Sequence, residues 1–232
     1  MSIYSRNSSF KIELGAQPLD LPPVSDDPAF GLSYKLVGKR LLDISLVLMS
    51  LIIVVPVIAL MAFLVALDGH SPFYTQERVG RDGRRFRIVK IRTMVHNADA
   101  LLQEHLAKDT VLRAEWEATQ KLKRDVRITR IGRVLRKTSL DELPQLINVL
   151  FGSMSLVGPR PMMPSQEALY PGRAYYRLRP GITGFWQISD RNTCDFRDRA
   201  KFDNAYEQEM SFKTDIRTLW RTVAVVLRGT GY

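Results

Sequence analysis

Residues that form disulfides and zinc sites are scarce in this sequence. The 232 residues include one cysteine, Cys194, and three histidines. A single cysteine excludes an intrachain disulfide, so a reducing compartment is expected. The histidines (His70, His96 and His105) lack the spacing of a zinc site, and no cysteine cluster completes one.

The beginning of the chain lacks the apolar core of a signal peptide. Residues 1–33 are instead rich in Ser, Pro and Asp, with no sustained apolar period. This composition predicts a polar, mobile N-terminal tail. The chain also contains no internal repeat.

Negative charge is in the minority, because 24 Asp and Glu stand against 34 Lys and Arg, for a net charge of +10. A positive excess indicates an anionic partner, and nucleic acid, an acidic membrane surface and a phosphorylated substrate are all compatible with it. Hydrophobic residues make up 45% of the chain, which is enough for a packed core. The length suits one ordinary domain with an appendage.

The segment after the tail is strongly apolar. Basic residues including Lys35 and Lys39 precede an uncharged stretch that runs from Ile44 to Leu67. At ~1.5 Å of rise per residue, a helix of this length could cross ~30 Å of hydrocarbon. Length alone therefore favours a simple transmembrane anchor.

Two features favour a different arrangement of this segment. Pro56 lies in its middle, where it removes a helical hydrogen bond and clashes with the preceding turn. Both flanks are basic, and positive residues favour the cytoplasmic side. A helix that enters the membrane, breaks at Pro56 and returns satisfies both flanks. We therefore predict a re-entrant helix over residues 34–70, with a spanning helix as the close alternative, and a cytoplasmic domain over residues 71–232.

The cytoplasmic domain reads as a small α+β fold, rich in helices and with short strands. Residues 72–95 alternate apolar and charged side chains around Arg81-Asp82-Gly83, which predicts two strands and a turn. Further helices are expected over residues 98–123, with Asn97 as the cap, and over residues 141–150. Residues 175–188 suit a loop or a strand edge because Pro and Gly interrupt them.

A last helix is expected from about Asp215 onward. Apolar residues recur there at helical spacing, with arginines beside them. A core helix is the first interpretation of this pattern, and an amphipathic helix at a membrane interface is the second. The apolar positions are Ile216, Leu219, Trp220, Val223 and Leu227.

Asp141 and Glu142 form an acidic pair between clusters of cations. Arg136 precedes the pair, and Arg160 follows it in the motif GPRP. Arginines can hold phosphate oxygens, while a carboxylate can attack phosphorus or bind a divalent metal. Helix capping is the competing explanation, because Ser139-x-x-Glu142 matches a capping box. GPRP taken alone also fits a rigid surface turn.

Other cationic and aromatic residues are candidates for the same site. Lys90 and Arg92 alternate with apolar residues, which fits either the solvated face of a strand or a phosphate site. Arg191 and Trp186 fit either a polar loop or a nucleotide contact, through a hydrogen bond and through stacking respectively.

Six motifs in order make the chain similar to bacterial sugar transferases. They are KRLLD, QERVG, FRIVKIRTM, KRDVRITRIGRVLRKTSLDELPQLINVL, GSMSLVGPRP and LRPGITGFWQISDRN. The chain from about Lys39 onward resembles the monotopic polyprenyl-phosphate phosphoglycosyl transferases. The additional helical segment before KLKRD is similar to exopolysaccharide initiators of the ExoY type.

The resemblance implies a reaction and a place for it. Such enzymes move a sugar-1-phosphate, here galactose or glucose, from a UDP-sugar to undecaprenyl phosphate and release UMP. Asp141 would be the nucleophile that forms a covalent phosphosugar, Glu142 would bind Mg²⁺, and Arg136 and Arg160 would hold phosphate. The implied location is the cytoplasmic face of the bacterial inner membrane, among its lipids. No nucleic-acid partner is implied, and a homodimer stays open.

Two rival functions make different predictions. A non-enzymatic, membrane-anchored protein that binds anions would lose binding steeply with added salt and show no turnover with magnesium. A transferase that moves only the sugar would release UDP in place of UMP.

Overall fold

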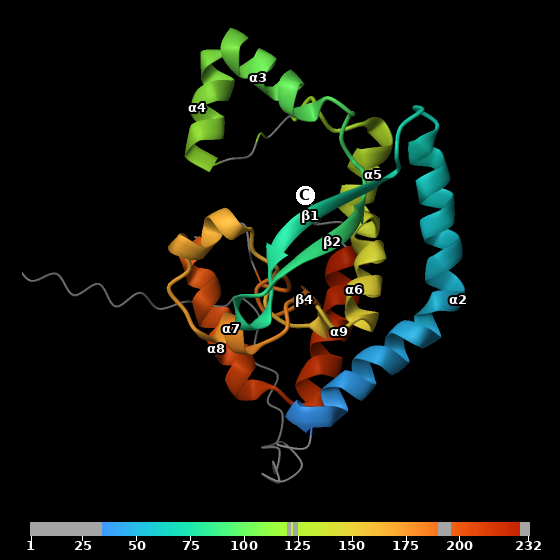
Figure 1. Cartoon of the computed structure of the whole chain (residues 1–232), viewed down its shortest axis with the longest axis vertical. Coiled ribbons are helices and arrows are strands. Elements are labelled where there is room, and N and C mark those ends of the chain that lie inside the picture. Colours follow the sequence, from blue (N-terminus) through green and yellow to red (C-terminus); the bar gives the residue numbers. More distant parts are fainter. Residues whose placement is uncertain (1–33, 120–121, 123–124, 190–195, 228–232) are drawn as a thin grey trace, which may run out of the picture.

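The computed structural model describes residues 34–119, 122, 125–189 and 196–227 (Figure 1). The predicted N-terminal tail lies outside these residues. The α+β prediction is confirmed, because two small two-stranded sheets are set among helices.

The apolar segment forms a single long helix. A short π-helical turn, η1 (Tyr34–Gly38), leads into α2 (Lys39–Ala66), which continues through Pro56. Within the described part of the chain, this is the one helix long and apolar enough to cross a membrane. Figure 1 shows α2 bent roughly midway along its length, as a proline inside a helix favours. The predicted break at Pro56 is therefore a bend within one continuous helix.

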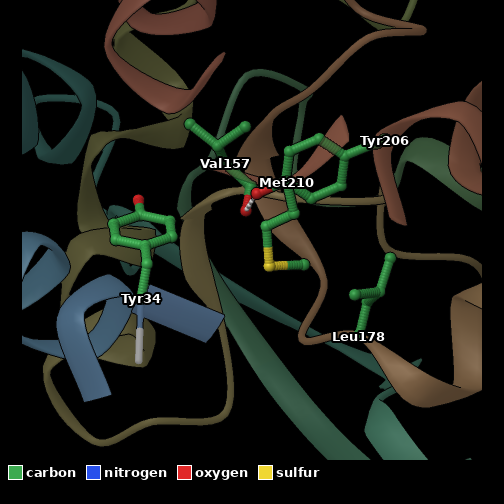
Figure 2. Close-up of a cluster of buried hydrophobic side chains, with 5 residues drawn as sticks. All are labelled: Tyr34, Val157, Leu178, Tyr206 and Met210. Carbon is green, nitrogen blue, oxygen red and sulfur yellow. Dashed lines mark hydrogen bonds between the residues drawn. The ribbon is translucent and has the colours of Figure 1, made fainter. Parts of the chain in front are cut away.

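The N-terminal end of α2 is anchored in the core of the domain. Tyr34 joins Tyr206 and neighbouring apolar side chains in a buried cluster (Figure 2). Tyr34 and Tyr206 both donate hydrogen bonds to Asp215, and Lys39 forms an ion pair with the same carboxylate at 2.7 Å. One turn further, buried Asp43 accepts a hydrogen bond from Ser155 at 2.7 Å. These contacts fix the entry of the apolar helix relative to the domain.

The predicted strands and turn are confirmed. Strands β1 (Phe73–Val79) and β2 (Arg85–Ile91) pair antiparallel, and the 3-10 turn η2 (Arg81–Gly83) connects them. Gly83 has φ of +73°, a conformation that glycine adopts without steric cost. Ile88 and Ile91 on β2 are buried, so this strand lies against the core.

The helix predicted over residues 98–123 is wrong in one respect, because two helices occupy that region. They are α3 (Ala98–Lys108) and α4 (Thr110–Thr119). Asp109 between them is extended, and its carboxylate accepts hydrogen bonds from the backbone N–H groups of Val111 and Leu112. It therefore starts a second helix in place of continuing the first. Asn97 precedes α3 but makes no side-chain capping bond.

The remaining elements surround a short parallel strand pair. Strand β3 (Ser155–Val157) pairs with β4 (Gly181–Thr183), and β4 lies in the segment 175–188 that was expected to be a loop or a strand edge. The end of a short helix, α7 (Ala174–Arg177), also falls in that segment. The helical elements in chain order are α5 (Arg130–Thr138), η3 (Leu140–Gln145), α6 (Leu146–Leu150), η4 (Pro164–Leu169), α7 (Ala174–Arg177), η5 (Phe196–Asp198), α8 (Arg199–Glu209) and α9 (Phe212–Leu227).

The last helix differs from the core helix that its pattern predicts. Leu219 on α9 packs against the buried cluster, as expected. Trp220 and Val223 point outward and are 77% and 52% exposed. The buried side of α9 instead carries Asp215, which binds Lys39, and Thr218, whose hydroxyl bonds to the preceding turn. Hydrogen-bonding partners therefore decide which face of α9 is buried.

Candidate active site

The acidic pair lies on η3, directly after α5. Ser139 separates the two helices in a left-handed conformation (φ 56°), and its N–H closes α5 on the carbonyl of Arg136. The Ser139 side chain makes no capping bond, so the capping-box explanation is wrong. The tight turn sets both carboxylates on the wall of a cavity that lies over β2.

This cavity has a volume of about 740 Å³. That volume is within the ~300–1,000 Å³ that is typical of small-molecule sites. It brings together six of the predicted residues, from β2 and the position after it, α5, η3 and the segment after β3. They are Lys90, Arg92, Arg136, Asp141, Glu142 and Arg160.

Lys90 connects the two carboxylates. Its Nζ lies 2.6 Å from Glu142 Oε1 and 4.0 Å from Asp141 Oδ2. Arg160 Nη2 approaches the same Glu142 oxygen at 3.5 Å. The pair is thus held by two cations from different parts of the chain, which explains how two adjacent acids are tolerated.

Asp141 is more buried than a nucleophile exposed to solvent would be, with 9% of the residue accessible. Burial raises the pKa of its carboxyl to about 6, and the Glu142 carboxylate adds to the rise. Lys90 and Arg136 oppose this shift. Asp141 is therefore mostly ionised at neutral pH and partly desolvated, as suits a nucleophile.

Arg136 is positioned by the contact between α5 and the end of β2. Its Nε donates to Thr93 Oγ1 at 2.9 Å. Gly132 makes the contact possible, because a side chain at this position would collide with the Thr93 backbone. The Thr129 hydroxyl caps α5 by accepting from the Gly132 N–H at 2.9 Å. Arg136 is thereby held in the wall of the cavity that Asp141 also lines, and the two charges interact.

Arg160 belongs to a buried strap and not to a surface turn. Gly158 and Pro159 are buried, and their backbones bond to Thr183 and Gly181 at 2.8 Å. A side chain at Gly158 would collide with the Arg179 carbonyl. The explanation of GPRP as a surface turn is therefore wrong. The buried backbone of Gly158 and Pro159 fixes the position from which the Arg160 side chain extends.

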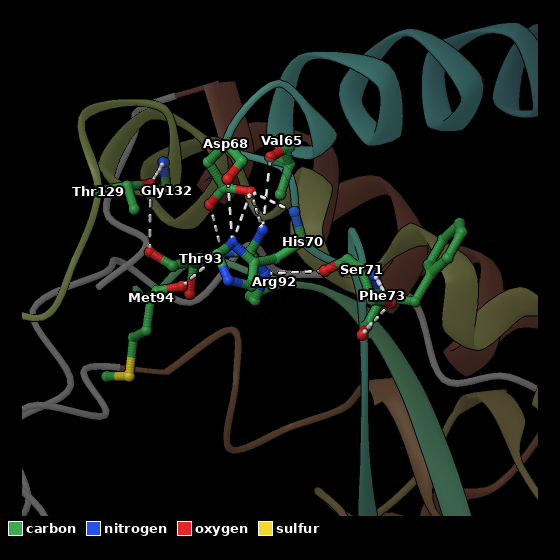
Figure 3. Close-up of polar contacts among 10 residues, drawn as sticks. All are labelled: Val65, Asp68, His70, Ser71, Phe73, Arg92, Thr93, Met94, Thr129 and Gly132. Carbon is green, nitrogen blue, oxygen red and sulfur yellow. Dashed lines mark hydrogen bonds and ion pairs between the residues drawn. The ribbon is translucent and has the colours of Figure 1, made fainter. Parts of the chain in front are cut away.

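Arg92 lines the cavity, but its guanidinium is directed to the end of α2 (Figure 3). Two of its nitrogens bind Asp68 at 2.7 Å, and it also donates to the carbonyls of Ser71 and Met94. These bonds hold the pKa of Asp68 low, at about 2. Arg92 thus joins the C-terminal end of α2 to β2, and a phosphate role for it stays a prediction.

Trp186 lies between two arginines. The guanidinium of Arg199 is 4.2 Å from the centre of its ring, and that of Arg160 is 5.9 Å away. A buried Nε1 on Trp186 has no hydrogen-bond partner. Arg191, the second predicted nucleotide contact, lies outside the described residues. Nucleotide binding by either residue stays a prediction.

Sequence reasoning missed two further arginines near Arg160. Arg78 from the QERVG motif and Arg199 from α8 are largely buried. In the described part of the chain, the Nε of each has no hydrogen-bond partner. Burial, followed by the charge of Arg160, lowers the pKa of both, to about 10 for Arg199. The sequence gives little indication that these two arginines belong to the site, since each looks like an ordinary charged residue near an aromatic one. Three guanidiniums this close favour an anion beside them.

Comparison with known proteins shows the family to which the chain belongs. Residues 34–229 match the family model described as bacterial sugar transferase. The chain is 47% identical over 195 residues to the undecaprenyl-phosphate galactose phosphotransferase of Salmonella typhimurium, covering 83% of this chain and 41% of that protein. It is 42% identical over 198 residues to the exopolysaccharide production protein ExoY of Sinorhizobium fredii, covering 84% and 88%.

A third relative is named for a different sugar. The UDP-glucose:undecaprenyl-phosphate glucose-1-phosphate transferase of Klebsiella pneumoniae is 34% identical over 212 residues, covering 87% of this chain and 42% of that protein. The chain therefore spans less than half of the Salmonella and Klebsiella proteins but most of ExoY. On the match of residues 34–229 and the likeness to ExoY along most of both chains, this protein belongs to the bacterial sugar transferase family.

Proposed function

We propose that this protein is a phosphoglycosyl transferase that moves a sugar-1-phosphate from a UDP-sugar to undecaprenyl phosphate and releases UMP, as the first membrane step of exopolysaccharide biosynthesis. The observation that carries the proposal is the Asp141-Glu142 pair in a cavity with Lys90, Arg136 and Arg160. Family membership supports it, as do relatives named for galactose phosphate and glucose-1-phosphate transfer to undecaprenyl phosphate.

The chemistry follows from the ionised Asp141. Its Oδ attacks the β-phosphorus of the UDP-sugar, forming an acyl phosphate bond as the bond from the β-phosphorus to the bridging oxygen breaks. UMP leaves with that oxygen. A phosphate oxygen of the lipid then attacks the same phosphorus, the bond to Asp141 breaks, and the carboxylate is restored. Arg136 and Arg160 stabilise the charge on the phosphoryl oxygens in both steps.

The carboxylates suit a magnesium ion. In the described residues, no group of three or more His, Cys, Asp or Glu side chains could hold a metal by itself. Mg²⁺ commonly uses only one or two carboxylates, together with substrate phosphates and water, so Glu142 beside Asp141 fits it. When bound, it would neutralise negative charge on the diphosphate. Lys90 and Arg160 hold Glu142 in place for this role.

Several contacts support the proposal that the protein lies at the cytoplasmic face of the inner membrane and that α2 is re-entrant. Lys39 at the start of α2 and Asp68 just after its end both form ion pairs with the same domain. Both ends of the helix then lie on one side of the membrane. Between them, side chains such as Ile52 (83% exposed) and Phe63 (62% exposed) point away from the domain. Trp220 on α9 would lie at the interface.

Cysteine labelling tests this topology. In a Cys194→Ser background, Lys35→Cys and Arg81→Cys should both react with an impermeant thiol reagent only from the cytoplasmic side. Labelling from opposite sides would establish a spanning helix and reject the re-entrant one.

Release of UMP tests the reaction itself. With UDP-sugar alone, the wild type should release about one UMP per enzyme and retain the labelled sugar phosphate, because no acceptor is present. Asp141→Asn should lose both signals, while Asp82→Asn on the exposed β1–β2 turn keeps them. Wild-type rates from Asp141→Asn would reject the assignment. Release of UDP would indicate sugar transfer alone, and a panel of UDP-sugars would identify the donor.

A further inference from the structure

A second, apolar pocket adjoins the acidic pair on the side of α9. Its volume is about 260 Å³, below the range of sites for whole small molecules and too small for a nucleotide sugar. Half of its lining residues are leucine, isoleucine or valine, from η3, α6, β4, the turn after β4 and α9. They are Leu140, Leu143, Leu146, Ile182, Ile188, Val225 and Val226.

The two cavities meet at three residues. Ser139, Glu142 and Arg160 line both the polar cavity and the apolar pocket. A molecule in the apolar pocket would therefore place its polar end beside the acidic pair, with a guanidinium available to it. This arrangement fits an amphiphile with an anionic head and an apolar tail.

An unpartnered amide lies in the wall of the apolar pocket. Gln187 is 7% exposed, and neither its Oε1 nor its Nε2 has a hydrogen-bond partner among the residues that the structure describes. Leaving a buried amide unpaired is unfavourable, so a ligand that pairs with it is favoured. A phosphate held by Arg160 at the junction could accept from the Gln187 Nε2.

The surface beyond the pocket offers a path for a longer apolar chain. Thr138 lines the pocket and ends α5. Val134 and Ile131 lie on the same side of α5 at helical spacing and are 59% and 36% exposed. Arg133 and Lys137 on this helix are exposed as well, as suits contact with an anionic membrane surface.

From these observations we propose that the apolar pocket between η3 and α9 binds the first isoprene units of the polyprenyl phosphate acceptor, with the acceptor phosphate at Arg160 and Gln187. The proposal rests on the proposed transferase function and assigns the acceptor a place separate from the donor. The donor occupies the polar cavity, and the two substrates approach Asp141 from opposite sides of Glu142 and Arg160.

Filling the pocket separates the two half reactions. Val226→Trp should raise the KM for undecaprenyl phosphate by about tenfold or more, since excluding an isoprene unit removes several buried methylene groups. Farnesyl phosphate should show the same rise, because the pocket takes the units next to the phosphate. The single-turnover burst of UMP without lipid should equal that of wild type. Val223→Trp, on the exposed side of α9, is the matched control and should change neither quantity.

Thr138→Trp at the mouth of the pocket carries the same test if Val226→Trp fails to fold, since Thr138 lies at the partly exposed end of α5. An unchanged KM for both lipids in a variant with a normal burst would overturn the proposal. So would a lost burst with an unchanged lipid KM, because the pocket would then serve the nucleotide. An effect on vesicle binding alone would point to an ordinary phospholipid. Absence of a UMP burst in the wild type would instead reject the transferase function.

Discussion

Lys90 lies against Glu142, at 2.6 Å, and is further from Asp141, at 4.0 Å. Lys90 therefore holds the Glu142 carboxylate in place and attracts the Asp141 carboxylate only at longer range. Because Lys90 is the strongest of the charges that lower the pKa of Asp141, it limits the rise that burial causes. The two acids therefore differ in their surroundings. Glu142 is paired with Lys90 and Arg160, while the Asp141 carboxylate is the one proposed to attack phosphorus.

Removing Lys90 should shift the pH dependence of the first step. The pKa of Asp141 is about 6, so the UMP burst rate should fall as pH drops through about 6, where the nucleophile gains a proton. In Lys90→Met the pKa rises further and the midpoint moves to higher pH. Lys90→Arg keeps the positive charge and should return the midpoint most of the way to its wild-type pH. Lys108→Met, from an exposed ion pair on α3, is the control. A midpoint that stays in place in Lys90→Met would contradict this role.

Asp141→Asn should be more stable than the wild type at neutral pH. The folded-state pKa of about 6 lies above the ordinary value of 3.8. The favourable contribution of the protonated group is therefore complete below pH ~4 and is lost as pH rises through about 6. The ionised carboxylate then costs roughly 1–3 kcal/mol. The Tm of Asp141→Asn in detergent should exceed that of wild type at pH 7.5, and the difference should shrink toward pH 4. An equal or lower Tm at pH 7.5 would show that the carboxylate is not destabilising.

The sequence predicted the local elements better than their relationships. Alternating residues located β1 and β2, and the turn at Arg81–Gly83 required only nearby chemistry. The break at Asp109 was missed because an aspartate within a helical pattern can either cap a new helix or lie inside a continuing one. The spacing of the apolar residues does not distinguish these two cases. The buried face of α9 was misjudged because Asp215 is buried by Tyr34, Tyr206 and Lys39, which come from elsewhere in the chain.

The candidate site shows the same limit. The motifs and the cations beside Asp141 in the sequence indicated the main residues of the site. The fold brings six of the predicted residues into one cavity. The partner of Arg92 could not be predicted, because Asp68 follows the end of α2 and is separated from Arg92 by the β1–β2 hairpin. The cluster of Arg78 and Arg199 near Arg160 joins three distant segments, so no spacing in the sequence reveals it.

Arg92 should act in positioning more than in substrate binding. Its guanidinium is bound by Asp68 and by backbone carbonyls, so Arg92→Gln should lower the Tm while changing the KM for the UDP-sugar less than about twofold. Asp68→Asn removes only the exposed partner and should lower the Tm by less than Arg92→Gln does. In the double variant the losses should be less than additive. A KM raised about tenfold in Arg92→Gln with an unchanged Tm would instead assign it to phosphate binding.

Gly132→Ala should damage the site without touching it. The new methyl group would press on the Thr93 backbone, where α5 contacts the end of β2. Overpacking of this kind costs about 1–3 kcal/mol, and moving α5 displaces Arg136, whose Nε bonds to Thr93. The UMP burst rate should therefore fall about tenfold or more together with the Tm, because a small misplacement of a phosphate-holding group is costly. Gly69→Ala is the matched control, since a side chain there meets open space and only the positive φ is strained. If Gly132→Ala kept the burst rate while the Tm fell, the contact between α5 and β2 would support the fold alone, and Arg136 would not depend on it for its position.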